Sequence, residues 1–204
     1  MNVVLMADVV GSSSKAAKQL MSDFKESIKW MNKLHRKDIQ SPLTITLGDE
    51  FQGVVKSPSV AIQIMIALEE HLMTLKKPFK LRYVIYEGKI DTETNKMRAY
   101  EMLGPALTNA RATLNDMKST KNRFSVHLLN TGIAHQLNLS LFVLQGIIDR
   151  WNPTQQKLAM GFLKSDYREL AKRLKKDPSS MWRRRKSLMM EEYESLKKLI
   201  QSTI

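Results

Sequence analysis

Residues 43–53 read LTITLGDEFQG, and this stretch decides how the N-terminal part of the chain folds. Apolar and polar residues alternate up to Leu47, a glycine and two carboxylates follow, and a second apolar run begins at Phe51. Alternation with a period of two is typical of strands, and a Gly-Asp pair between two such runs is typical of a hairpin turn. We therefore predict strands over 43–47 and 51–55, joined by the Gly-Asp-Glu turn.

On both sides of this hairpin, segments typical of strands alternate with segments typical of helices. Short runs rich in β-branched residues predict strands, and apolar residues at helical spacing predict helices. We expect further strands over 3–9, 79–90 and 124–129, and helices over about 16–34, 57–75, 102–117 and 133–150. The order β-α-β-β-α-β-α-β-α favours an α/β (α+β) fold with a mixed sheet.

The charge of the chain points to an anionic partner. The formal net charge is +13, and a strong basic excess favours nucleic acid or nucleotide partners, although a lysine-rich solvated surface has the same composition. Residues 151–204 hold 13 Lys and Arg against 6 Asp and Glu, a net +7 in about a quarter of the chain. This shift, together with Asn152-Pro153, predicts a domain boundary near residue 150.

The composition and the first residues also bear on the compartment. The chain has no cysteine, which excludes disulfides and thiolate metal sites and favours a reducing compartment. The first residues lack the basic start of a signal peptide, and Asp8 interrupts their apolar run. No stretch reaches the ~18 apolar residues that a spanning helix needs. We therefore expect a cytoplasmic protein that does not cross a membrane.

Two carboxylates mark a possible metal site. Asp8 ends the first predicted strand, and Asp49 lies in the hairpin turn. If the first strand neighbours the hairpin, these carboxylates lie close together, and Mg²⁺ commonly takes one or two carboxylates plus substrate phosphates. Residues 11–14 precede a predicted helix, where backbone N–H groups can bind phosphate. Asp and Gly are also common turn residues, so a purely structural role is equally compatible with this pattern.

Four segments in this order resemble the class III nucleotide cyclase domain: ADVVGSS (7–13), TLGDEFQGVV (46–55), LRYVIYEGKI (81–90) and LGPALTNARATL (103–114). The hairpin also resembles the turn of diguanylate cyclases, which share the palm-type fold. Over nearly its whole length the chain resembles the SatD family, small bacterial proteins with such a domain and a C-terminal helix-turn-helix. The resemblance implies a ferredoxin-like, palm-type domain over 1–132, a connecting helix over 133–150 and a helix-turn-helix domain over 151–204.

Carried over position by position, the resemblance implies roles for individual residues. Mg²⁺ or Mn²⁺ would be bound by Asp8, Asp49 and the carbonyl of Val9. A nucleotide would be bound at Val9, Gly11, Ser12, Ser13, Gly48 and Arg111. The catalytic candidates are Asp8, Asp49, Glu50 and Arg111. Two alternatives stay open. Glu50 could be an exposed turn residue, and Arg111 could pair with a surface carboxylate.

The chain departs from the cyclase pattern where cyclases read the base and stabilise the transition state. Ile45 occupies the position of the base-reading Lys. Thr108 and Ala112 occupy the positions of the helical Asn and Arg, while Asn109 and Arg111 lie one position away. Stabilisation of transition-state charge is usually the largest catalytic contribution. The resemblance therefore implies a metal-nucleotide pocket without ordinary cyclase activity.

The basic tail, WNPTQQKLAMGFLKSDYRELAKRLKKDPSSMWRRRKSL (151–188), predicts three short helices. The first ends near Leu163, the second begins at Ser165-Asp166, and the third is opened by 178–180 and begins at Met181 after a short turn. The segment resembles the helix-turn-helix of SatD proteins and of sigma-factor region 4-like regulators. A further predicted helix over 188–200 either closes this small domain or pairs with a second copy.

The third of these helices carries the predicted DNA contacts. In a helix-turn-helix the second helix of the motif enters the major groove, where Arg binds guanine edges and Lys or Arg neutralises phosphates. The candidates are Ser179, Ser180, Trp182, Arg183, Arg184, Arg185 and Lys186. Trp182 could instead belong to the core, and the basic run could be only a solvated face.

Three hypotheses of different classes follow. The first is a DNA-binding regulator whose cyclase-like domain binds a nucleotide with Mg²⁺. The alternative is an active metal-dependent nucleotidyl cyclase or nucleotidyltransferase that uses Asp8 and Asp49. A third is an interaction module that kept the fold and binds neither ligand. The expected partners are double-stranded DNA and a nucleoside triphosphate or other nucleotide, and the resemblance implies a possible homodimer.

Overall fold

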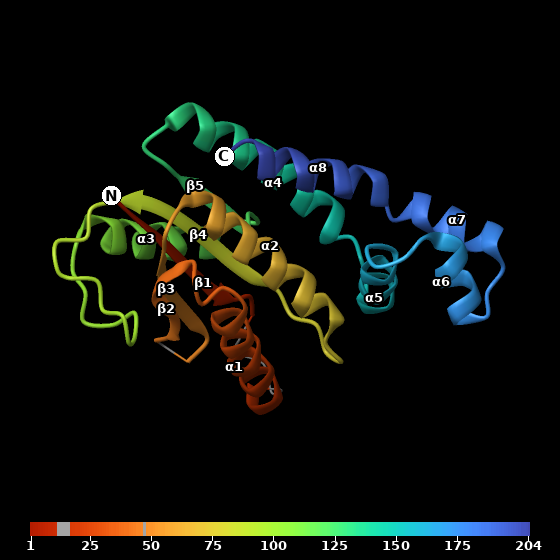
Figure 1. Ribbon diagram of the computed structural model, residues 1–204, viewed down its shortest axis with the longest axis horizontal. Helices are drawn as coiled ribbons and strands as arrows, with labels where there is room; N and C mark the ends of the chain where they lie inside the picture. Colours follow the sequence, from red (N-terminus) through yellow and green to blue (C-terminus); the bar gives the residue numbers. More distant parts are fainter. Residues whose placement is uncertain (12–16, 47) are drawn as a thin grey trace.

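The computed structural model describes residues 1–11, 17–46 and 48–204 (Figure 1). Within these residues the chain forms one five-stranded mixed sheet and eight α-helices. The strands are β1 (Asn2–Val9), β2 (Ile39–Ile45), β3 (Glu50–Val55), β4 (Leu81–Gly88) and β5 (Phe124–His127). The helices are α1 (Ala17–Leu34), α2 (Pro58–Thr74), α3 (Pro105–Asp116), α4 (Thr131–Ile148), α5 (Pro153–Phe162), α6 (Tyr167–Leu174), α7 (Pro178–Ser187) and α8 (Met190–Ser202), with a 3₁₀ turn, η1, over Met117–Ser119.

The predicted order of strands and helices is confirmed, and several boundaries differ by a few residues. Glu50 is the first residue of β3 rather than part of the turn, and β2 begins at Ile39 and ends at Ile45. Helix α7 begins at Pro178, before the predicted start, because the Asp177 side chain accepts a hydrogen bond from the Ser180 N–H and proline suits the first helical turn. The predicted serine cap of α1 lies outside the described residues.

The sheet has the strand order β2-β3-β1-β4-β5. Strand β1 pairs antiparallel with β3 and with β4, β3 pairs antiparallel with β2, and β5 is added parallel to β4. The first four strands therefore have the arrangement of the ferredoxin-like βαββαβ motif. Because β1 is central, all of its residues except the first are buried.

Alternate residues of β1 face two different layers. Val3, Leu5, Ala7 and Val9 pack with α1, α2 and α4 in the main apolar cluster. Val4 and Met6, from the other face, pack under α3 and the loop over 89–104. Asp8 shares this second face by strand alternation. The site at the end of β1 therefore opens on the α3 side of the sheet.

The helices after residue 130 continue the main core. Helix α4 packs on β5 and α8, α5 packs on α2, and Figure 1 shows α4 and α8 side by side with α5–α7 at one end. The Trp151 and Tyr193 ring centroids are 5.4 Å apart, and the Trp151 indole donates to the Leu188 carbonyl at 3.2 Å. One apolar cluster runs from the sheet to Met181 and Ile200. Among the described residues, no helix combines the length and apolar composition that a membrane span requires.

A buried arginine joins three elements of this core. The Arg123 side chain, 6% exposed, forms two hydrogen bonds with the Glu69 carboxylate at 2.9 and 3.2 Å. It also pairs with Asp149 at 3.0 Å and donates to the Leu81 carbonyl at 2.7 Å. Burial alone would lower the pKa of Arg123, but the two carboxylates raise the pKa above its usual value, so the guanidinium stays charged. Arg123 therefore links α2, β4 and the end of α4.

Candidate functional site

The strand register brings the predicted carboxylates together. Asp8 is the Cα partner of Glu50 in the β1–β3 pair, and the Val9 N–H donates to the Asp49 carbonyl at 2.9 Å. Asp8 and Glu50 are each 4% exposed, whereas Asp49 is half-buried. The expected adjacency of Asp8 and Asp49 is thus present. The alternative that Glu50 is an exposed turn residue is wrong, because the Glu50 side chain is buried under α3.

Asp8 already has a cationic partner. Arg82, its Cα partner in β4, donates to both carboxylate oxygens at 3.0 and 3.2 Å, and the Lys118 ammonium lies 3.8 Å away. Burial raises the pKa of the Asp8 carboxyl, although Arg82 acts in the opposite direction and Asp49 adds a small increase. Arg82 balances the charge of a carboxylate that few water molecules can reach.

Glu50 forms the second pair of the site. The Arg111 guanidinium lies 2.8 Å from Glu50 and donates to the Gln52 side-chain carbonyl at 3.1 Å. The Thr46 hydroxyl also donates to Glu50, at 3.2 Å. The alternative of a surface partner for Arg111 is therefore wrong, because its carboxylate is buried. Arg111 reaches from α3 across the sheet face to β3.

Gly104 fixes where α3 begins and so where Arg111 points. Gly104 is the N-cap residue of α3 and has φ +152°, a conformation that side chains rarely adopt. A Cβ there would lie 2.7 Å from the Ile90 Cα and 2.8 Å from the Asp91 nitrogen. The glycine of the predicted Gly-led helix is required by this close approach of backbone to backbone.

The two loops at the end of β1 contribute glycines with positive φ. Gly11 has φ +71° and Gly48 has φ +85°, and both are exposed. The predicted phosphate ligands Ser12 and Ser13 lie outside the described residues. Within the described residues, no cluster of three or more His, Cys, Asp or Glu side chains could hold a metal ion.

The residues fit a divalent ion only in part. Asp8 at the end of β1 and Asp49 in the turn before β3 can supply oxygen ligands, and Mg²⁺ takes one or two carboxylates when phosphates complete its coordination. The Asp8 oxygens, however, are both occupied by Arg82. A metal at Asp8 therefore requires Arg82 to move towards another anion, and the phosphates of a nucleotide are suitable anions.

A cavity of about 520 Å³ adjoins the Glu50–Arg111 pair on the α3 side. Its polar wall comes from Thr46, Gln52, Glu101, Thr108 and Arg111. The rest is mainly apolar and comes from Met6, Met102, Leu103 and Leu107 with Tyr100. A mostly apolar cavity of this size with a few convergent polar groups is typical of a small-molecule site.

The positions that depart from the cyclase pattern do not converge on this site. Ala112 is exposed on α3, and Asn109 donates to the Tyr86 hydroxyl at 3.0 Å. Thr108 lines the cavity but carries no charge, and Ile45, at the base-reading position, has no polar group. Of the cations on this face, Arg82, Arg111 and Lys118 point at carboxylates.

The predicted DNA-binding helix is formed, and most of it is exposed. Met181 is buried, while Trp182 is 47% exposed, so the alternative of a core tryptophan is wrong. The Lys186 ammonium lies 5.8 Å from the centre of the Trp182 ring. At helical spacing, Ser179, Trp182, Arg183 and Lys186 share one outward face of α7.

The basic residues of α7 fall into two groups. Arg185 pairs with Glu191 at 2.7 Å and Glu194 at 3.4 Å, and Lys186 pairs with Glu191 at 3.1 Å. Arg183 and Arg184 are exposed, and the described part of the chain offers neither an ion-pair partner. These two arginines are therefore available to a ligand.

Sequence reasoning missed Arg82, Lys118 and Gln52. Arg82 could have been found, because strand alternation in LRYVIYEG places it on the face of Val84, and a neighbouring strand would then set it beside Asp8. Lys118 and Gln52 have no local signal. Lys118 reaches the site only through η1, after the end of α3.

Comparison with known proteins gives a match to a family model and distant likenesses among solved structures. The family model described as "SatD family" matches residues 2–202. Among solved structures, the crystal structure of the guanylyl cyclase Cya2 is similar over 56% of this chain and 69% of its own, with 11% identity and a TM-score of 0.40. A search of curated proteins finds no match. The family match spans nearly the whole chain.

Proposed function

This chain belongs to the SatD family, and we propose that it is a cytoplasmic DNA-binding regulator. In this proposal α7 reads double-stranded DNA, while the end of β1 binds a nucleotide together with Mg²⁺ and has no ordinary cyclase activity. The observation that carries it is the exposure of Arg183 and Arg184 on α7, a helix held in place by a buried core, without an ion-pair partner in the described part of the chain.

The geometry of α6 and α7 supports DNA binding. Lys175, in the turn between them, has the left-handed φ of +52°, and Met181 and Leu188 fix α7 against its neighbours. Pro178 and Ser179 at the start of α7 are exposed, as groove entry requires. Arg183 and Arg184 can bind base edges or phosphates. Trp182 adds a large exposed surface for sugar and base contacts.

We expect Arg183→Ala/Arg184→Ala to weaken binding to genomic DNA fragments roughly tenfold to a hundredfold at moderate salt. The slope of log K against log salt should fall by about 2, because each phosphate contact contributes about 0.9 to that slope. Fluorescence anisotropy across a salt series measures both quantities. Lys25→Ala/Lys29→Ala on α1 is the control, since it removes the same charge from exposed positions. Equal slopes for the two double variants would refute the role of α7.

The same proposal includes a homodimer. Helix-turn-helix proteins commonly bind two half-sites one helical turn apart as dimers. Leu139, Phe142 and Val143 are each more than half exposed on α4, which is the kind of surface that a second copy covers. The stoichiometry of the DNA complex tests this part of the proposal.

The nucleotide part rests on the charges at the end of β1. Arg82, Arg111 and Lys118 surround Asp8 and Glu50, so a triphosphate would find three cations on one face. Mg²⁺, when bound, would link carboxylate oxygens to phosphate oxygens. Asp8 and Asp49 would hold the ion, and Arg82, released from Asp8, would bind phosphate. The adjoining cavity would receive the base.

We expect no ordinary cyclase activity, because the side chains on α3 that would face the nucleotide cannot stabilise the transition state. Thr108 and Ala112 carry no charge, and Arg111 is engaged by Glu50 and Gln52. Charge that develops on the phosphates in the transition state would then lack its dedicated donors. Pyrophosphate release from any nucleoside triphosphate would instead support the alternative of an active nucleotidyl cyclase or nucleotidyltransferase.

We expect a nucleoside triphosphate with Mg²⁺ to raise the thermal unfolding midpoint, and Asp49→Asn to abolish the Mg²⁺-dependent part of the shift. A ligand at about 100 times its Kd stabilises the native state by about 2.7 kcal/mol, which a thermal scan resolves. Asp116→Asn, an exposed carboxylate at the end of α3, is the control. If the Mg²⁺-dependent shift of the unfolding midpoint is as large in Asp49→Asn as in the parent, the hairpin carboxylate does not bind the metal ion.

A further inference from the structure

A cavity of about 800 Å³ lies at the other end of the β1–β3 pair. It is lined by Asn2 at the start of β1 and Lys56 after β3, whereas Asp8 and Glu50 mark the opposite end. Asn2 and Asp8 are six residues apart along β1, roughly 20 Å at the rise of an extended strand. This cavity is therefore separate from the site described above.

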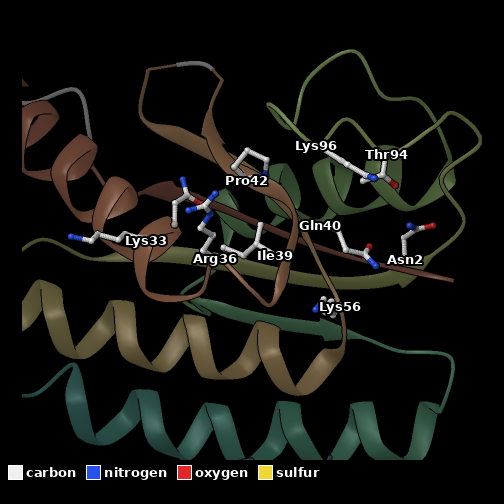
Figure 2. A pocket seen from close by; sticks show the side chains of 10 residues that line it. Asn2, Lys33, Arg36, Ile39, Gln40, Pro42, Lys56, Thr94 and Lys96 are labelled. Atoms are coloured by element: carbon white, nitrogen blue, oxygen red, sulfur yellow. The ribbon is translucent and has the colours of Figure 1, made fainter.

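All charged residues that line the cavity are basic. Arg36, Lys56 and Lys96 line it, and none of its ten lining residues is acidic. All three cations are exposed, and within the described residues none of them forms an ion pair. Lys33 also lines the cavity, but Figure 2 shows its ammonium pointing away from the other side chains. The cavity concentrates positive charge from three separate segments of the chain.

The remaining lining suits an aromatic ring with polar edges. Ile39 and Pro42 from β2 provide an apolar surface beside Arg36 in Figure 2, and Gln40 and Asn2 carry side-chain amides. Amides donate and accept hydrogen bonds, as base edges require. Three unpaired cations next to an apolar surface and amides match the parts of a nucleotide: phosphates, a flat ring and ring-edge polar groups.

The wall that carries Lys96 is fixed to the sheet. The Ser41 hydroxyl donates to the Asn95 carbonyl at 2.5 Å, and the Ala99 N–H donates to the Thr44 hydroxyl at 2.8 Å. The Gln52 amide also donates to the Ala99 carbonyl, and Ala99 is fully buried. A loop held at several points keeps the cavity open without a ligand, and such preorganisation lowers the entropic cost of binding.

We propose that this cavity binds a free nucleotide without a metal ion, with the phosphates on Arg36, Lys56 and Lys96 and the base over Ile39 and Pro42. The proposal is independent of the Mg²⁺-dependent site at Asp8 and of DNA binding by α7. It gives the sheet domain a second ligand site at its far end.

The test is isothermal titration calorimetry of the full chain with ATP and with GTP, in EDTA and at low salt. We expect at least one of the two nucleotides to bind. Arg36→Ala/Lys96→Ala should weaken this binding roughly tenfold or more, and Lys56→Ala should weaken it as well, because charge-assisted hydrogen bonds to the phosphates are lost. Lys25→Ala/Lys76→Ala removes two exposed lysines outside the cavity and should bind like the parent. EDTA removes the divalent ion that the hairpin site requires, which separates this site from the hairpin site.

Four results would overturn the proposal. The first is that neither ATP nor GTP binds in EDTA, and the second is that the Lys25→Ala/Lys76→Ala control loses as much nucleotide affinity as Arg36→Ala/Lys96→Ala. The third is that inorganic pyrophosphate binds as tightly as the triphosphates. The fourth is that only a single-stranded oligonucleotide binds. The third would mean that the base makes no contact. The fourth would make the cavity part of a nucleic-acid surface.

Discussion

Arg123→Met is expected to lower the free energy of unfolding by about 3–5 kcal/mol, because it leaves a buried carboxylate without its partner. Glu69 is only 9% exposed at its side chain and receives two hydrogen bonds from Arg123. The Leu81 carbonyl loses a donor as well. Chemical denaturation followed by tryptophan fluorescence measures the change.

Arg98→Met is the matched control for this prediction. Arg98 pairs with Glu101 at 3.1 Å, but both side chains are more than half exposed, and such pairs contribute about 0–1 kcal/mol. A double variant, Arg123→Met/Glu69→Leu, should recover much of the loss, since it also removes the stranded charge. If Arg123→Met costs no more than Arg98→Met, the buried pair is not a stability determinant.

Arg82→Met is the second large effect, and it should depend on pH. At neutral pH the loss of Arg82 leaves Asp8 charged and 5% exposed, at an expected cost of about 3–5 kcal/mol. The Asp8 pKa is already raised above 3.8 by burial, and removing Arg82 raises it further. The folded variant then holds a proton that the unfolded chain has released, so its stability falls as pH rises from about 4 through the folded-state pKa.

Denaturation at pH 5 and pH 7.5 measures this dependence as the difference between variant and parent. The deficit should be smaller at pH 5. Asp8→Asn/Arg82→Met carries no titrating group at this position, so the deficit of this double variant should not grow between pH 5 and pH 7.5. If Arg82→Met shows the same deficit at both pH values, Asp8 is not the group that Arg82 stabilises.

Much of the fold follows from local patterns, and the site follows from them only in part. Alternation around 43–55 and the run over 3–9 predicted the strands, and their adjacency followed from the order of elements. Asp8 and Asp49 were therefore placed together correctly. The partners of these carboxylates could not be placed without the register, because one residue of slip would turn Arg82 to the other face.

The cationic cavity shows where sequence reasoning ends. Arg36, Lys56 and Lys96 lie in three segments, each with ordinary neighbours, and only the loop over 89–104 brings Lys96 to β2. Helices α5–α7 are the opposite case. Their caps, turn and apolar positions lie within about forty consecutive residues, so local order predicted the three helices, although the partners of Arg185 on α8 were not foreseen.

The shared apolar cluster has a consequence for how the two ends of the molecule influence each other. Tyr193 donates to Glu70 of α2 at 2.9 Å, and Lys197 pairs with the same carboxylate at 2.6 Å, so α8 is bonded to a helix that covers the sheet. Transient opening of α7 must therefore disturb packing that also supports β1. A ligand that binds only the closed form lowers the population of open forms throughout a cooperative unit. Occupancy at the sheet would thus slow backbone amide exchange in α7 without any change of shape.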